Sequence, residues 1–248
     1  MKAKTIDEVI IFLDEIIATA KKENSRLGYF PALYRKVTIR VKEGIRDGIF
    51  QNESRMETLD VNFANRYLEA FELQKKGGQP TLSWKLAFEK CQTWRPIALQ
   101  HLLLGMNAHI SLDLGIAAAE TMKGKNLQDI KEDFNKINDL LISMINEVQD
   151  DLAEVWPALK YLDKIAGRTD EKLSGFGMVL ARGAAWKVAE EISNTPGEKL
   201  QERIRKIDER VKENSNLIAY PGFLISSVLL WIRMSEKQSV SEVIDLLC

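Results

Sequence analysis

The only two histidines of the chain, His101 and His109, lie in one apolar segment, PIALQHLLLGMNAHISLDLGIAAAETM (96–122). An α-helix advances about 100° per residue, so Asp113 lies about 40° from His109 around the axis and Glu120 falls between them. The spacing predicts one polar face on an apolar helix, with His101 on its adjoining flank. Because buried carboxylates and imidazoles are costly unless they are paired, this face must meet polar partners.

Two functions fit this face, and the sequence leaves both open. His109 and Asp113, at positions i and i+4, can bind one metal ion or act as general base and orienting carboxylate in a metal-dependent hydrolase of a small ester or phosphoester. Asp60 and Glu120 would add ligands, and such a carboxylate-rich set favours Mg²⁺, Mn²⁺ or iron over zinc. Alternatively, the pair is a structural hydrogen-bond network in a non-enzymatic helical module that binds a ligand or a protein.

Tyr34, His101 and Arg182 are further residues that we expect to contact a small-molecule ligand. Tyr34 belongs to a group of aromatic residues that could line a pocket or pack in the core, and Arg182 could bind an acidic substrate or pair with an internal carboxylate. Gly105 and the alanines 117–119 are small, which permits a second helix or a ligand to approach the apolar helix closely.

Composition places the chain among soluble globular proteins and argues against several partners. Lys and Arg number 35 and Asp and Glu 36, so the net charge of −1 gives no field that would hold nucleic acid or an anionic membrane. The two cysteines form no disulfide framework. We expect a cytoplasmic protein, because acidic residues interrupt the N-terminal apolar run, unlike in a signal peptide.

The most apolar later stretch, LIAYPGFLISSVLLWIRM (217–234), is interrupted by Pro221 and Gly222. Its unbroken part, from Phe223 to Ile232, is too short to span a bilayer. The stretch therefore predicts a buried core helix and no membrane span. The oligomeric state stays open.

Apolar residues recur at helical spacing along the chain, and Pro and Gly divide it into about ten helical segments. The segment 36–45 alternates apolar and polar residues but also fits a period of four, so we predict a helix there. These patterns predict one all-α domain over 1–248, built around the apolar helix 96–122. The predicted helices are 5–23, 31–47, 54–76, 81–91, 96–122, 126–154, 156–166, 170–194, 197–213 and 221–234, with a short tail near 239–247.

The run LLLGMNAHISLDL (102–114) resembles the signature of a bacterial domain-of-unknown-function family numbered 5995. The stretches METLDVNFANRYLEAF, FNKINDLLISMINEVQDDL and ARGAAWKVA are similar to other parts of that family. The resemblance implies a helical fold with no established activity. It marks Asn107, His109 and Asp113 as the distinctive polar positions, and Asn107 as a further ligand contact. The weaker stretches add Asp60, Asn138, Arg182 and Trp186.

Overall fold

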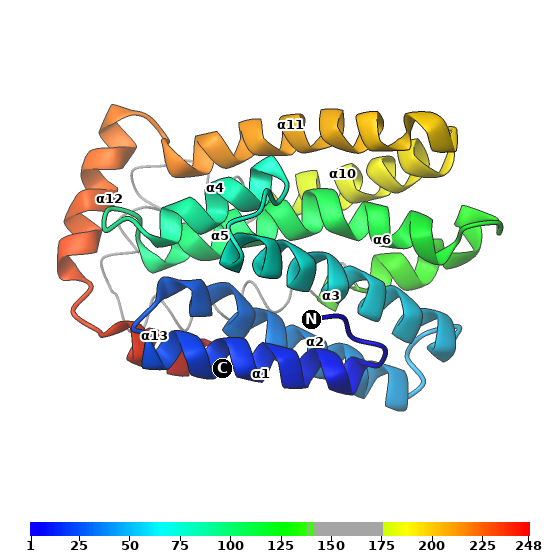
Figure 1. Ribbon diagram of the computed structural model, residues 1–248, viewed down its shortest axis with the longest axis horizontal. Coiled ribbons are helices and arrows are strands. Elements are labelled where there is room, and N and C mark those ends of the chain that lie inside the picture. The colour runs from blue at the N-terminus through cyan, green and yellow to red at the C-terminus, as the bar shows by residue number, and fades with distance from the viewer. Residues whose placement is uncertain (138, 141–175) are drawn as a thin grey trace.

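The computed structural model describes residues 1–137, 139–140 and 176–248, without the side chains of 176–182. All regular elements in these ranges are helices, so the predicted all-α fold class is confirmed (Figure 1). The α-helices are α1 (Ile6–Lys22), α2 (Tyr29–Arg46), α3 (Glu53–Lys75), α4 (Leu82–Cys91), α5 (Ala98–Ala108), α6 (Leu114–Thr121), α10 (Phe176–Ser193), α11 (Leu200–Ala219), α12 (Phe223–Ser235) and α13 (Val240–Leu247). A π-helical turn, η2 (His109–Asp113), joins α5 to α6, and the 3₁₀ turns are η1 (Arg26–Gly28), η3 (Leu127–Ile130) and η5 (Gly197–Lys199).

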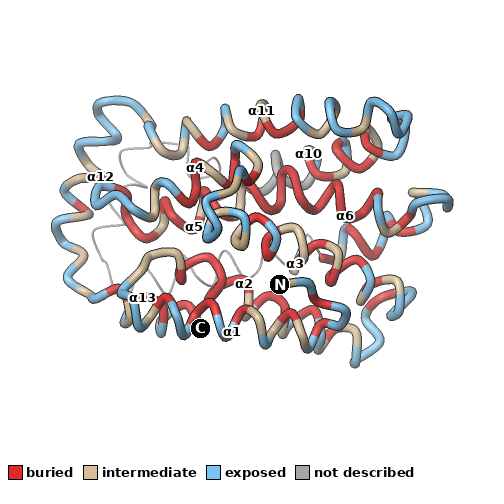
Figure 2. Tube along the Cα trace, viewed as in Figure 1, coloured by how far each residue is buried: buried red, intermediate tan, exposed pale blue. Residues whose placement is uncertain are grey.

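The helix formed by α5, η2 and α6 runs through the middle of the molecule, and every residue from 108 to 119 is buried (Figure 2). It packs against α3, α4, α10 and α11. By length and composition alone, this helix, Ala98–Thr121, could cross a membrane, but 83% of its apolar window is buried inside the protein. A core helix of a globular protein has this character, and the apolar segment 96–122 was predicted to be central for the same reason.

Small residues let neighbouring helices approach the central helix closely. A Cβ added to Gly105 would lie 2.5 Å from Cδ2 of Phe30 in α2. A Cβ added to Gly115 would lie 2.5 Å from the carbonyl oxygen of Ala185 in α10. Contacts this short are forbidden to real side chains, so only glycine permits the observed packing at both positions.

Helix starts are fixed by capping side chains. Thr5 accepts a hydrogen bond from the backbone N–H of Glu8 at the start of α1, and Asn52 does the same at the start of α3. Helix α4 is capped from another element, because Asp208 of α11 accepts hydrogen bonds from the backbone N–H groups of Leu82 and Ser83, at 2.5 and 3.0 Å. The Ser83 hydroxyl also donates to Asp208, at 2.7 Å. This cap joins α11 to α4.

The structure confirms the helical prediction for 36–45, which lies in α2. The predicted helix 197–213 corresponds to η5 and α11, which continues to Ala219, and Ile207, Asp208, Val211 and Ser215 are its buried residues. Of the predicted helix 126–154, the structure describes 126–137 and 139–140, and 156–166 lies outside the described residues.

The prediction of a buried core helix in the stretch 217–234 is wrong. Helix α12 lies across one end of the molecule, and only Leu229 and Ile232 are buried in it (Figures 1 and 2). Because this helix is apolar all round, its sequence does not show which face packs inward. Helices α11 and α12 meet at 64° across the break at Pro221 and Gly222, and this pair also has the composition of a broken span.

Candidate functional site

The candidate site is built on the π-helical turn in the middle of the central helix. The backbone N–H of Leu114 donates to the carbonyl of His109, five residues earlier. A π turn inserts one additional residue into an α-helix, and such turns are rare and often found at functional sites. His109 begins the turn and Asp113 ends it, and both are buried, at 2% and 1% exposure.

Asp113 is fully satisfied by donors from three elements. Its Oδ2 accepts from Nε1 of Trp84 at 2.7 Å and from Nδ1 of His109 at 3.2 Å. Its Oδ1 accepts from Nε of Arg66 at 3.3 Å, and this guanidinium compensates the carboxylate charge. Because a carboxylate oxygen accepts at Nδ1, the proton of the imidazole lies on Nδ1, and Nε2 is an acceptor.

Aromatic rings enclose the His109 imidazole. Phe63 of α3 stacks on it with ring centroids 3.6 Å apart, and Tyr34 of α2 meets it edge to face at 4.5 Å. Phe30 and Trp84 lie at 5.5 and 5.9 Å. Burial lowers the pKa of His109, although the hydrogen bond and charge of Asp113 oppose this shift. The imidazole is therefore neutral at physiological pH.

Several buried polar atoms near this imidazole have no hydrogen-bond partner among the described residues. They are Nε2 of His109, Oη of Tyr34, Oδ2 of Asp60 and Oη of Tyr67. Burial raises the pKa of the Tyr34 hydroxyl well above its usual value, and the charges of Asp60 and Asp113 add to this shift. The hydroxyl therefore lies near both carboxylates. Asp60 precedes Phe63 by one turn on α3, which brings its carboxyl to the same side of the helix as the ring on His109. We call Tyr34, Asp60, His109 and Asp113 the His109 cluster.

Asp60 differs from Asp113 in having no cationic partner within the described residues. Burial raises the pKa of the Asp60 carboxyl from 3.8 to about 7, and the charge of Glu57 adds to the shift. At neutral pH this carboxyl is therefore close to half ionised. A carboxylate left without a compensating charge in the interior is expensive, which makes it the unusual group of the cluster.

The model for the Family of unknown function (DUF5995) matches residues 6–221. The chain belongs to this family. No curated protein and no solved structure matches the chain. The family match includes every residue of the His109 cluster and ends two residues before α12. Membership in DUF5995 brings no activity with it, so the chemistry of the cluster must be argued from its geometry.

Of the four metal ligands predicted, the structure places three in the interior and one outside. His109, Asp113 and Asp60 are buried, whereas Glu120 is exposed. The π turn explains why Glu120 is exposed, because one inserted residue rotates the rest of the helix by about 100°. No three His, Cys, Asp or Glu side chains form a group that could hold a metal in the part of the chain that the structure describes.

The ligand contacts predicted from the sequence are separated in the structure, and only Tyr34 belongs to the cluster. Asn107 joins the central helix to α11, donating to the Val211 carbonyl and the Ser215 hydroxyl at 3.0 and 2.9 Å. His101 packs edge to face on Tyr29 at 5.7 Å, and burial lowers the pKa of His101 to about 3.

Of the remaining family positions, only Trp186 has a side chain that the structure describes. The side chain of Arg182 and the whole of Asn138 lie outside the described residues. Trp186 donates to Glu190 at 2.8 Å and packs against Phe134.

Arg66 and Phe63 complete the site without having been predicted, and Trp84, one of the aromatic residues expected to line a pocket or pack in the core, is the third residue that completes it. They come from α3 and α4, and the spacing of residues within 96–122 carries no information about them. A weak signal existed for α3, where Asp60, Phe63 and Tyr67 follow one face at positions i, i+3 and i+7.

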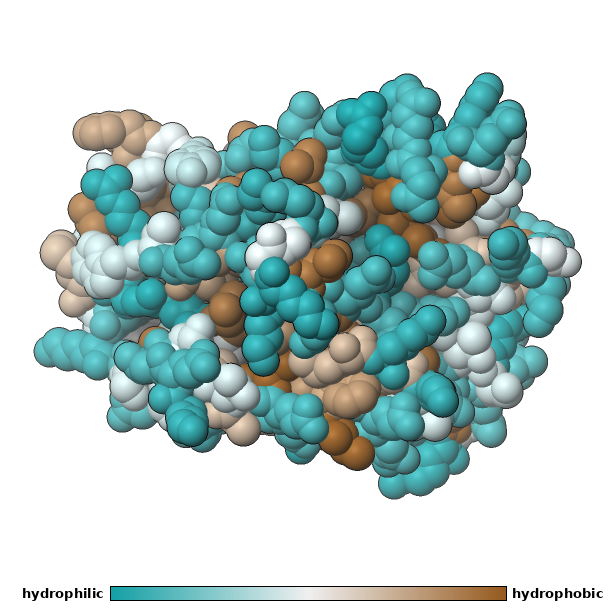
Figure 3. Space-filling model, in the orientation of Figure 1, coloured by the Kyte–Doolittle hydropathy of each residue, from teal (hydrophilic) through white to brown (hydrophobic). Residues whose placement is uncertain are grey.

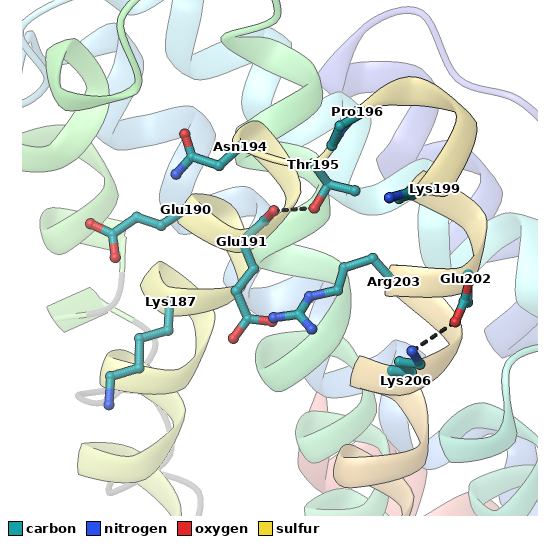
Figure 4. Close-up of a pocket in the computed structure, with 10 residues that line it drawn as sticks. All are labelled: Lys187, Glu190, Glu191, Asn194, Thr195, Pro196, Lys199, Glu202, Arg203 and Lys206. Carbon is teal, nitrogen blue, oxygen red and sulfur yellow. Dashed lines mark hydrogen bonds and ion pairs between the residues drawn. The ribbon is translucent and has the colours of Figure 1, made fainter.

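A surface pocket of 740 Å³ lies between the end of α10 and the start of α11 (Figure 4). Charged side chains line it, and most of its carboxylates are paired. Glu191 accepts from Arg203 and Arg210 at 2.9 and 2.8 Å, and Glu202 pairs with Lys206 at 2.7 Å. Paired charges of this kind are usual on a solvated surface, so the pocket adds no catalytic group.

Proposed function

We propose that the protein is a non-enzymatic helical module that binds a small ligand carrying a protonated amine at the His109 cluster. The observation that carries the proposal is the buried Asp60 carboxyl, which has no cationic partner among the described residues and whose charge acts on the Tyr34 hydroxyl, another buried atom without a partner there. A buried acceptor without a donor costs about 1–3 kcal/mol, and a charged one costs more. A cationic donor would remove these costs together.

The chemistry of the unpartnered atoms favours a cation over a neutral or anionic ligand. His109 Nε2 and Asp60 Oδ2 can only accept while His109 is neutral and Asp60 is ionised, and the Tyr34 oxygen can accept as well. An ammonium group carries three donors in a compact head, which matches this set. The aromatic faces around His109 also attract cations, and desolvation strengthens that attraction.

Metal-dependent hydrolysis, the other function predicted from the sequence, has less support. A metal ligand must offer a free lone pair toward the ion, whereas Asp113 already receives three donors on its two oxygens. Glu120 is exposed, and its charge acts on Arg66 and Asp113 without a hydrogen bond to the pair that the structure records. The His109–Asp113 pair instead fits the structural network of the second interpretation, since Asp113 fixes the tautomer and leaves Nε2 as an acceptor.

Thermal unfolding with small amines tests this function. At about pH 8, where most of Asp60 is ionised, ammonium or methylammonium chloride should raise the melting temperature above that in sodium chloride of equal concentration. The Asp60→Asn variant should lose this response. Asp129→Asn, which removes a carboxylate from the exposed surface, is the matched control and should keep it.

Two results would contradict the proposal. One is a wild-type protein whose melting temperature does not distinguish methylammonium from sodium. The other is an Asp60→Asn variant that responds as strongly as wild type. Tyr34→Phe separates the contribution of the Tyr34 hydroxyl to amine binding from that of its ring, because it keeps the ring that packs on His109 and removes only the hydroxyl acceptor. We expect an intermediate response for it.

A further inference from the structure

Helix α12 presents large apolar side chains to solvent at one end of the molecule. Phe223 is 84% exposed and Leu224 76%, and Tyr220, Trp231 and Met234 are also exposed. We call these five residues the α12 patch. Figure 3 shows tan, white and brown side chains over this end of the protein, where Figure 1 places α12.

The exposed residues of α12 form a stripe. At 100° per residue, Phe223, Met234, Trp231 and Leu224 lie within an arc of about 100°, opposite the buried Leu229 and Ile232. A helix that is apolar on both faces is normally covered on both. Exposed apolar area of this kind marks a surface for another protein or for a membrane.

Basic side chains surround the patch. Lys90 Nζ lies 3.9 Å from the ring centroid of Tyr220, and the Arg233 guanidinium lies 5.3 Å from that of Trp94, another exposed aromatic residue. Arg95 is exposed beside Trp94. No acidic residue occurs in 90–112 or 214–235, the segments that carry the α12 patch, Lys90, Trp94 and Arg95. Glu236 is the nearest acid after α12, and it is buried and paired with Arg233 at 2.8 Å.

We propose that the α12 patch docks onto the surface of an anionic lipid bilayer. Phe223 and Leu224 would enter the boundary between headgroups and acyl chains, and the exposed Trp and Tyr rings would lie at headgroup level. The exposed Arg95 and the partly exposed Lys90 would attract anionic headgroups, which is the charge complementarity that selects this partner. Helix α12 lies across the end of the molecule, so a flat surface can approach the patch along the whole helix.

The net charge of −1 does not conflict with this proposal, because the attraction acts locally within a Debye length of about 8 Å. The patch is also independent of the His109 cluster. Helix α12 begins beyond the family match, and the cluster residues lie in α2, α3 and η2. Failure of amine binding would leave the lipid proposal standing, and the reverse also holds.

Vesicle sedimentation of the full chain tests the proposal. We expect the protein to sediment with vesicles of phosphatidylcholine mixed with phosphatidylserine, to remain in solution with phosphatidylcholine alone, and to bind less as salt rises. The double variant Phe223→Ser/Leu224→Ser should bind about tenfold more weakly or worse, because it removes the inserted apolar area. Ile11→Ser/Ile49→Ser removes two other exposed apolar side chains and should bind as wild type does.

A second measurement separates charge from apolar insertion. Arg95→Gln should weaken binding to the anionic vesicles and leave the melting temperature unchanged, since Arg95 is exposed. Equal binding to both vesicle types, or equal binding by the Phe223→Ser/Leu224→Ser variant, would overturn the proposal. Absence of vesicle binding together with a dimer that this double variant abolishes would overturn it in favour of a second copy of the chain.

Discussion

Replacing Asp60 with Asn should stabilise the protein by an amount that grows with pH. Asp60 has a pKa of about 7 in the folded protein against 3.8 for an unperturbed carboxyl. Below pH 3.8 the carboxyl is protonated in both states. As pH rises, the unfolded chain loses this proton first, so the folded state loses stability until Asp60 itself ionises near pH 7.

The magnitude follows from the pKa difference. At about 1.36 kcal/mol per pKa unit, the shift from 3.8 to about 7 corresponds to a loss of about 4 kcal/mol over the whole titration. Between about pH 5 and pH 8 the loss is about 3 kcal/mol, and Asp60→Asn removes it because an amide does not ionise. Any packing cost of the amide is independent of pH, because the amide does not ionise. 

Urea unfolding at several pH values measures this effect as the difference in unfolding free energy between Asp60→Asn and wild type. The difference cancels the opposite contribution of His109, whose lowered pKa makes stability fall as pH drops below 6.5. A difference that is the same at about pH 5 and pH 8 would refute the assignment of an uncompensated carboxyl. Asp129→Asn should show no such dependence, because its carboxyl is exposed.

Three further substitutions test the packing and the hydrogen bonds around the site, each by urea unfolding. Gly115→Ala should destabilise the protein by about 2 kcal/mol or more, because the new Cβ meets the backbone of α10. Gly183→Ala is its control: open space surrounds Gly183, so the stability should stay unchanged or rise by about 0.5–1 kcal/mol. Asp208→Ala should cost about 3 kcal/mol through three lost hydrogen bonds at the start of α4, and an unchanged stability would exclude this cap. Trp84→Phe keeps an aromatic ring but removes the donor to Asp113, and a loss of about 2 kcal/mol is expected.

The sequence predicted which helix carries the centre of the site better than it predicted which residues make up the site. The contact between His109 and Asp113 follows from their spacing, since side chains at i and i+4 meet in both α and π turns. The angular position expected for Glu120 assumed a regular α-helix, and no residue pattern in 109–113 signals the π turn. Arg66 and Trp84 depend on how α3 and α4 pack on the central helix, which is long-range information that helical periodicity does not contain.

The two buried carboxyls show how the same residue type acquires different roles within one core. Asp113 receives donors from Arg66, Trp84 and His109, so its charge is compensated and its position is fixed. Asp60 lies in the same aromatic interior without a cation, and burial holds its pKa near neutrality. Because Asp113 already accepts three donors, the tightly bonded pair organises the site, while Asp60 provides its unsatisfied charge. A cation that enters the cluster would therefore gain most of its binding energy from Asp60, the residue that spacing on the central helix could not place.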